Sequence, residues 1–147
     1  MTDILTISIK SEHGEDFIPF QATIGSAGRD IFSPIDITIA SGEVILIPTG
    51  LRMEIPLGYE IQLRSRSGLA LKHKIVILNS PATIDSDYRG EIKVILINHG
   101  TNSYTFKRGE RVAQMVLNKC YNWVAHLKDG KLKPSSRGDG GFGSTGA

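Results

Sequence analysis

Apolar and polar residues alternate along many short segments of the chain, with glycine, proline or asparagine residues at the turns between them. Two segments are almost entirely apolar, which is typical of strands covered on both faces. The best helical candidate is the short segment 67–72, with Ser67 as its N-cap. The pattern predicts strands at residues 6–10, 35–39, 44–47, 59–64, 74–78, 91–97, 104–107 and 112–116.

Composition supports a β fold of one domain. Isoleucine is the most frequent aliphatic residue, and its stiff β-branched side chain favours pleated, half-buried surfaces over helices. With 16 Gly and 6 Pro in 147 residues, the sequence predicts an all-β sandwich or barrel with one short helix. Residues 129–147 hold almost no apolar side chains, so we expect a core of residues 1–128 followed by a flexible Gly-rich C-terminal arm.

Charge and cysteine content narrow the class of protein. The net charge of +2 lacks the large basic excess of a dedicated nucleic-acid binder, so we expect no direct contact with nucleic acid. No apolar run is long enough to cross a membrane and the first residues do not resemble a signal peptide, so no membrane partner is expected. Cys120 is the only cysteine, which excludes an intrachain disulfide and favours an intracellular, reducing compartment such as the cytoplasm or nucleus.

Polar residues interrupt the strand pattern at several places. Asp30 lies in a small-residue segment that is most simply interpreted as an acid-capped turn. Arg66, Ser67 and Gly68 lie where a strand runs into the predicted helix, and together they could form an anion site, although a solvated basic edge is the alternative. Gln114 interrupts an apolar run and needs hydrogen-bond partners if it is buried.

Two further segments carry candidate chemistry. Asp85 and Asp87 lie between apolar strands in Thr-Ile-Asp-Ser-Asp-Tyr-Arg-Gly, where a turn with solvated acids is one interpretation and a calcium loop would need oxygen ligands that are missing. Residues 137–146 read Arg-Gly-Asp-Gly-Gly-Phe-Gly-Ser-Thr-Gly, whose backbone can present successive N–H groups to phosphate oxygens. Phe142 is hard to assign to a core in this polar run and could stack on a planar ligand.

Five motifs follow one another along residues 26–146: Ala-Gly-x-Asp, Arg-Ser-Gly-Leu-Ala, Ile-Asp-x-Asp-Tyr-Arg-Gly, Gly-x-Arg-x-Ala-Gln and the glycine-rich terminal motif. This ordered array resembles that of the homotrimeric dUTP diphosphatases (dUTPases). The resemblance implies a jelly-roll-like β-sandwich or distorted barrel, assembled as a homotrimer whose active sites are shared between subunits. It also implies that the C-terminal arm closes over a bound small molecule, the substrate dUTP.

The implied reaction is hydrolysis of dUTP to dUMP and diphosphate, which limits uracil incorporation into DNA and supplies dUMP for dTMP synthesis. Asp85 matches the acid that activates the attacking water, and Mg²⁺, held mainly by substrate phosphates and water, is the implied cofactor. Asp30 matches an acid in the outer-sphere water network of that metal. The resemblance implies phosphate contacts from Arg66, Ser67, Gly68, Gln114, Arg137, Gly143, Ser144 and Thr145. It implies contacts to uracil or deoxyribose from Asn79, Thr83, Ile84, Asp85, Tyr88 and Phe142.

Base selectivity is implied to come from main-chain groups of a β-hairpin over residues 79–88. Cytosine would be rejected because each mispaired buried group costs about 1–3 kcal/mol. Arg29, Ser65 and Pro81 depart from the common family pattern.

Two alternative functions remain open. A dCTP deaminase-like enzyme of the same fold would need a catalytic glutamate in a Thr-Leu-Glu-like setting, and none follows the hairpin; a non-catalytic trimeric β-sandwich used for binding or assembly would not need the acid at Asp85.

Overall fold

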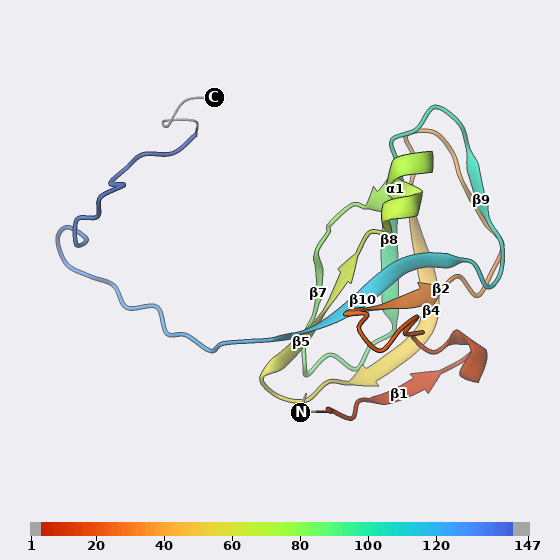
Figure 1. The fold of residues 1–147 in the computed structure, drawn as a ribbon, viewed down its shortest axis with the longest axis horizontal. Helices are drawn as coiled ribbons and strands as arrows, with labels where there is room; N and C mark the ends of the chain where they lie inside the picture. Colours follow the sequence, from red (N-terminus) through yellow and green to blue (C-terminus); the bar gives the residue numbers. More distant parts are fainter. Residues whose placement is uncertain (1–3, 143–147) are drawn as a thin grey trace.

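The computed structural model of the chain describes residues 4–142 and is mostly β, with one short α-helix, as the sequence predicts (Figure 1). The strands are β1 (Ser8–Ser11), β2 (Gly28–Phe32), β3 (Ile37–Ile39), β4 (Val44–Glu54), β5 (Tyr59–Arg64), β6 (Ile75–Ile77), β7 (Ala82–Ile84), β8 (Ile92–Asn98), β9 (Tyr104–Phe106) and β10 (Arg111–Lys119). The helix α1 spans Ser67–His73, and a 3-10 turn spans Glu15–Phe17.

The strands form two four-stranded sheets and one small two-stranded sheet. Their strand orders are β1-β4-β8-β6, β2-β10-β5-β7 and β3-β9, with antiparallel pairing throughout the described strands. The two larger sheets share one hydrophobic core. Strands β4 and β8 contribute Ile47 and Val94, which meet Leu63 of β5 and Met115 of β10 in that core. The alternation of side chains along each strand thus produces the sandwich that the sequence predicts.

A buried asparagine joins the small sheet to the large one. Asn98, at the end of β8, is fully buried, and its Nδ2 donates to the carbonyl oxygens of Ile39 at 3.3 Å and Asn102 at 2.9 Å. Its Oδ1 accepts the Gly100 N–H at 2.8 Å. Because a buried amide is costly unless its hydrogen bonds are made, these contacts fix the loop before β9 in one position.

The structure corrects the prediction of an acid-capped turn at Asp30. This residue lies within β2, where Asp30 is the cross-strand partner of Gln114 in β10. On its other edge, Asp30 exchanges two backbone hydrogen bonds with Phe20, at 2.8 and 2.9 Å. The local sequence is poor in apolar residues because this strand carries polar groups on one face, so only tertiary pairing reveals it.

The prediction of a β-hairpin over residues 79–88 is also wrong. Strand β6 pairs with β8 in one sheet, whereas β7 pairs with β5 in the other. The segment is therefore a crossover between the two sheets of the sandwich. The physical reason is burial: in this register Ile77 and Ala82 both enter the shared core from opposite sheets.

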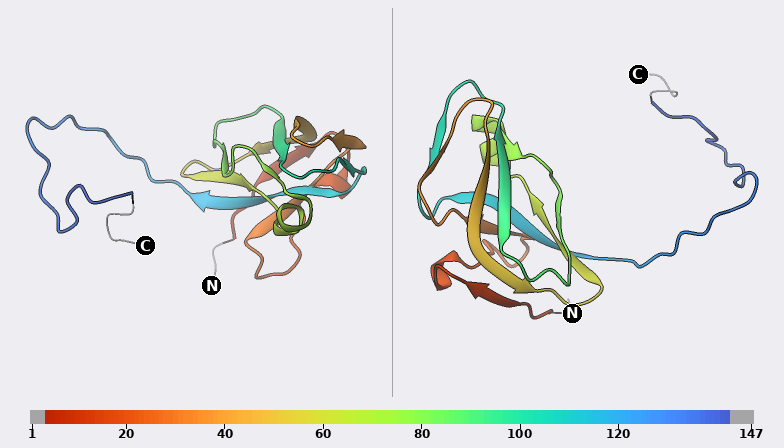
Figure 2. Two further views of the ribbon diagram at one scale, coloured as in Figure 1. Left: turned by 90° about the horizontal axis from the view of Figure 1, so that it is seen from above. Right: turned by 180° about the vertical axis from the view of Figure 1, so that it is seen from behind.

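Residues 120–142 leave the sandwich at the end of β10 and extend away from it without further helix or strand (Figures 1 and 2). Tyr121, Trp123 and Leu127 on this segment are exposed. The division into a core of residues 1–128 and an arm of residues 129–147 stays a prediction. Within residues 4–142, no helix is long and apolar enough to span a bilayer.

Candidate functional site

One cluster of polar side chains gathers around Asp30 on β2. Arg66 precedes α1, and its Nε donates to Oδ1 of Asp30 at 3.1 Å. Arg111, at the start of β10, places Nη1 3.4 Å from Oδ2 of the same carboxylate. Two guanidinium groups therefore share one carboxylate, which leaves an excess of positive charge facing a partly exposed surface. Such a surface favours an anionic ligand.

Gln114 belongs to this first cluster. It is the cross-strand neighbour of Asp30, so the two side chains lie on the same face of the sheet. Its Nε2 donates to the carbonyl oxygen of Ser65 at 3.0 Å, which satisfies the expectation that it finds a hydrogen-bond partner. A side chain at Gly28 would collide with Oε1 of Gln114, so this glycine provides the room for the glutamine. The hydroxyl of Ser65 accepts the Ile77 N–H at 2.8 Å and ties this link to β6.

The start of α1 completes the cluster. Ser67 and Gly68 are its first two residues, so their N–H groups have no intrahelical partner. The prediction of Ser67 as N-cap is wrong, because Arg66 holds that position in an extended conformation and Ser67 is already helical. Arg64, at the end of β5, donates to Oε1 of Gln62 at 2.8 Å, so this arginine is bound to a different partner from Arg66.

A second cluster surrounds Asp85, which is exposed directly after β7. Thr83, Ile84, Asp85 and Tyr88 line a pocket of about 410 Å³. The Tyr88 hydroxyl donates to the Glu91 carbonyl oxygen at 2.9 Å, and the Tyr88 N–H donates to the Asp85 carbonyl oxygen at 3.2 Å. The turn that carries the acid is therefore fixed at both ends.

The sequence did not single out several neighbours of these clusters. Arg52, Glu91 and Lys93 line the pocket beside Asp85, and Arg111 binds Asp30 in the first cluster. Arg111 lies inside the fourth motif and Glu91 directly follows the third, so motif context was the only signal for them. Asn79 is exposed on the crossover and does not line the pocket.

The two clusters lie apart within one chain. In the pairing of β5 with β7, Ile84 is opposite Ile61, so Asp85 comes level with Glu60. Arg66 follows six residues after Glu60, which at about 3.3 Å per residue corresponds to roughly 20 Å. Cys120 lies near the Asp85 end of β5: burial raises the pKa of its thiol, and the negative charges of Glu60 and Asp85 raise that pKa further.

Comparison with known protein families shows to which family the chain belongs. The dUTPase family model matches residues 16–146. The chain belongs to the dUTPase family. It is 48% identical over 145 residues to the deoxyuridine 5'-triphosphate nucleotidohydrolase of Chlamydia pneumoniae, with 97% of this chain and 99% of that protein covered. It is 47% identical to the enzyme of the same name from Rickettsia akari, with 98% and 99% covered.

Solved dUTPase structures share the fold. The dUTPase of Staphylococcus bacteriophage 80alpha with dUPNHPP superposes with a TM-score of 0.87 at 27% identity, covering 97% of this chain and 99% of the other. The dUTPase of Streptococcus mutans gives a TM-score of 0.74 at 25% identity, covering 81% and 98%. The all-β sandwich is therefore the dUTPase fold.

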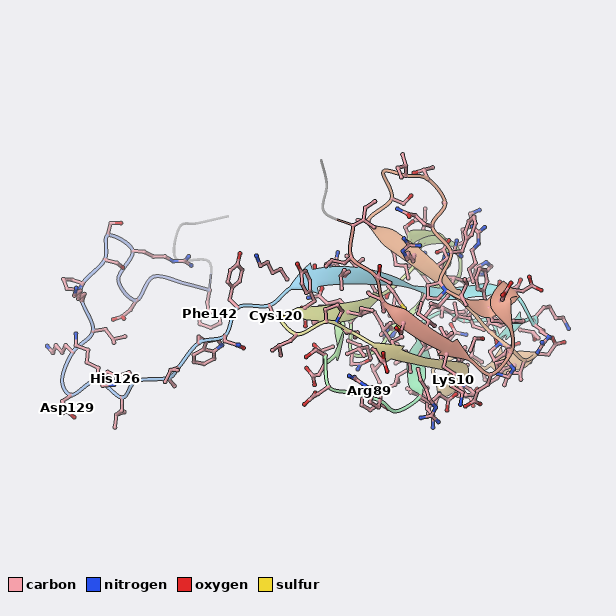
Figure 3. The ribbon with its side chains drawn as sticks, turned by 90° about the horizontal axis from the view of Figure 1, so that it is seen from below. Lys10, Arg89, Cys120, His126, Asp129 and Phe142 are labelled. Carbon is pink, nitrogen blue, oxygen red and sulfur yellow. The ribbon has the colours of Figure 1, made fainter. Side chains whose placement is uncertain are left out.

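Two arm residues that the resemblance assigns to the site, Arg137 and Phe142, lie away from both clusters. Arg137 is exposed and donates from Nε to the Gly140 carbonyl oxygen at 2.7 Å within the arm itself. Phe142 is fully exposed, on an arm that Figure 3 shows running out from Cys120 past His126 to Asp129 before it turns back toward Phe142. The residues Gly143, Ser144 and Thr145 lie outside the described residues.

Within residues 4–142, no group of three or more histidine, cysteine, aspartate or glutamate side chains is placed to hold a metal ion. Asp30 is the acid that the resemblance associates with Mg²⁺, and each of its carboxylate oxygens already has an arginine partner. Because both oxygens are occupied, the Asp30 carboxylate is better suited to contact a metal ion through water molecules than to coordinate it directly. Mg²⁺ as the cofactor stays a prediction.

Proposed function

We propose that the chain is a dUTP nucleotidohydrolase that uses Asp85 to activate the attacking water. The observation that carries the proposal is the position of Asp85, exposed at a pocket that also includes Tyr88. A carboxylate is ionised at neutral pH and can accept a proton from water. Attack of that water on the α-phosphorus forms a new P–O bond and breaks the bond to the bridging oxygen. The products are dUMP and diphosphate.

The cluster around Asp30 would bind the phosphates. Arg66, Gln114 and the free N–H groups of Ser67 and Gly68 converge on one surface, where they can stabilise the charge that develops on the leaving diphosphate. Mg²⁺ bound to the triphosphate would neutralise further phosphate charge, with Asp30 ordering its water shell. The protein itself supplies positioning and fixed positive charge.

We propose that the active site is shared between subunits of a homotrimer. The water at Asp85 and the cluster at Arg66 must reach the same triphosphate, and hydrogen bonds reach only about 3 Å. Within one chain these residues are roughly 20 Å apart along β5. A site that takes Asp85 from one subunit and Arg66 from the next removes this conflict. The extended arm, with Arg137 and Phe142, would close the site from a third subunit.

Substrate selectivity would follow from the segment 79–88, of which Thr83, Ile84, Asp85 and Tyr88 line the pocket and Asn79 does not. Main-chain groups of this segment, with the side chain of Asn79, would recognise uracil, while Thr83 and Ile84 shape the wall. The Tyr88 ring lies against Gly90 and would pack under the deoxyribose, leaving a ribose 2′-hydroxyl without a partner. By this selectivity the enzyme would limit uracil incorporation into DNA and supply dUMP for dTMP synthesis.

Product analysis tests this proposal. Diphosphate release would be measured with dUTP, dCTP, dTTP and UTP, each with Mg²⁺, and we expect efficient release only from dUTP. Reaction in ¹⁸O-labelled water should place the label in dUMP. Ammonia release from dCTP without diphosphate release from dUTP would instead indicate a deaminase. Absence of turnover with every nucleotide would indicate a binding or assembly protein.

A further inference from the structure

Arg111 lies beside the proposed phosphate cluster but has no role in the mechanism described above. Its guanidinium carbon lies 5.6 Å from the centroid of the Phe20 ring, an arrangement in which a cation is attracted to an aromatic face. Its Nη1 is 3.4 Å from Oδ2 of Asp30. Arg111 is thus held between an aromatic ring and the carboxylate that also binds Arg66.

Phe20 is placed for this contact by backbone pairing. Its N–H donates to the Asp30 carbonyl oxygen at 2.9 Å, and the Asp30 N–H donates back at 2.8 Å. This bridge sets the ring of Phe20 beside the edge of β2 on which the Asp30 carboxylate is presented. The position of the ring is therefore coupled to the position of the acid.

The backbone of Arg111 contacts Arg66 directly. The register of β10 against β2 shifts between Arg111 and Ala113, which marks a bulge. At this irregularity the Arg111 carbonyl oxygen accepts a hydrogen bond from Nη1 of Arg66 at 3.4 Å. Bulges commonly redirect groups next to functional sites, and this one supplies a second fixed point for the Arg66 guanidinium.

These contacts decide which donors of Arg66 remain available. Its Nε is bound to Asp30 and one N–H of Nη1 to Arg111. A guanidinium has five N–H donors, and Nη2 of Arg66 has no hydrogen-bond partner among residues 4–142. Two fixed points determine the plane of the group, so the free Nη2 edge is aimed in one direction.

We propose that Arg111 and Phe20 are positioning residues that orient Arg66 toward the substrate phosphates. The Phe20 ring holds Arg111 on Oδ2 of Asp30, so that Oδ1 is presented to Arg66. The inference rests on the proposed function of this cluster. It assigns no substrate contact to Arg111 or Phe20. Lysine could not replace Arg111, because an ammonium lacks the planar fork that can stack on a ring and bind a carboxylate together.

Ligands with and without phosphates separate this role from a general structural one. The variants are Arg111→Lys, Phe20→Leu and Phe20→Tyr. Lys107→Met is the control, because it also removes a cation that pairs with an aspartate, Asp36, but this pair belongs to the β3–β9 side of the fold. The KM for dUTP and the inhibition constants of dUpNHpp and deoxyuridine would be measured for each, with thermal melting as the check of folding.

We expect Arg111→Lys to raise the KM for dUTP and the inhibition constant of dUpNHpp by about tenfold, the size expected for loss of one charged hydrogen bond. The inhibition constant of deoxyuridine should not change. Phe20→Leu should act in the same direction and more weakly, while Phe20→Tyr, which keeps the ring, should behave as wild type. Lys107→Met should leave all three constants unchanged.

Several outcomes would overturn the inference. Equal weakening of deoxyuridine and dUpNHpp by Arg111→Lys would show a general structural effect. If Arg111 acts through Arg66, adding Arg111→Lys to Arg66→Lys should cost little more than Arg66→Lys alone. Full additivity would instead indicate that Arg111 binds phosphate itself. If Arg111→Lys does not fold, the Phe20 pair decides: identical constants for Phe20→Leu and wild type reject the role. Failure of wild type to hydrolyse dUTP would reject the proposed function separately.

Discussion

Arg66 and Asp85 lie at opposite ends of β5. Arg66 follows the strand after Arg64, the cross-strand partner of Gln114, whereas Asp85 follows Ile84, the partner of Ile61. A single sandwich thus presents two half-sites, one suited to phosphates and one that carries an exposed acid. In the proposed shared site these two half-sites come from at least two chains, which leads to the first prediction.

Mixed trimers should regain activity from two inactive variants. Asp85→Asn and Arg66→Met each damage a different half-site, so we expect each homotrimer to be nearly inactive. After unfolding and refolding together in equal amounts, random trimers with sites between neighbouring chains should show about one quarter of wild-type activity. Mixing the two folded proteins without subunit exchange is the control. No recovery in demonstrably mixed trimers would contradict shared sites.

Replacement of the proposed base should remove turnover while leaving binding. Asp85→Asn keeps the size and much of the hydrogen bonding of the side chain but cannot accept the proton from water. We expect kcat to fall by about 10²–10⁴-fold, with a folded trimer and little change in dUpNHpp binding. Glu60→Gln, which removes a neighbouring carboxylate, is the control for loss of charge alone. Wild-type turnover by Asp85→Asn would reject the mechanism.

Loss of the arm should reduce activity without unfolding the protein. Residues after Ser136 make no core contacts among those described, so a chain ending at Ser136 should melt at the wild-type temperature. We expect its kcat/KM for dUTP to fall strongly, because Arg137 and Phe142 would no longer close over the nucleotide. Leu132→Ala, which changes an exposed arm residue without a proposed role, should have no effect. Full activity of the truncated chain would make the terminus an idle tail.

Tyr88 should control the choice between deoxyribose and ribose. Its ring occupies the space beside Gly90 that a side chain there would fill. We expect Tyr88→Ala to lower the ratio of kcat/KM for dUTP over UTP by about tenfold or more, since the 2′-hydroxyl gains room and water. Tyr88→Phe keeps the ring and should keep the ratio. An unchanged ratio in Tyr88→Ala would place sugar selection elsewhere.

The thiol of Cys120 reports on the charge of Asp85. Burial raises its pKa, and the charges of Glu60 and Asp85 act in the same direction. The reactive thiolate should therefore form only at a higher pH than in a free cysteine. Asp85→Asn removes one of these charges, so we expect its pH profile of iodoacetamide labelling, followed by mass spectrometry, to shift to lower pH. Asp36→Asn is the control, and coincident profiles for Asp85→Asn and wild type would contradict the placement of Asp85.

The sequence by itself determined the fold class and most of the strands. Strict alternation at residues 59–64 predicts β5 with its observed ends, because a half-buried strand needs one apolar face. The short helical segment was also found, since its leucine and alanine residues favour a helix locally. The ordered motifs were sufficient to indicate the dUTPase family, because they depend on residue type and order rather than on distance.

Only the tertiary structure decided how the motif residues meet. Strand β2 was missed because its polar face gives no alternation signal, and its pairing partners, Phe20 and Gln114, are distant in sequence. The crossover between β6 and β7 was expected to be a hairpin because of the family resemblance, and neither that resemblance nor the local sequence reveals which sheet each strand joins. Asp30 likewise pairs with two arginines that are far from it in the sequence. Arg66 is 36 positions away and Arg111 is 81 positions away. Pairing across such separations is set by burial in the complete core, which no local pattern encodes.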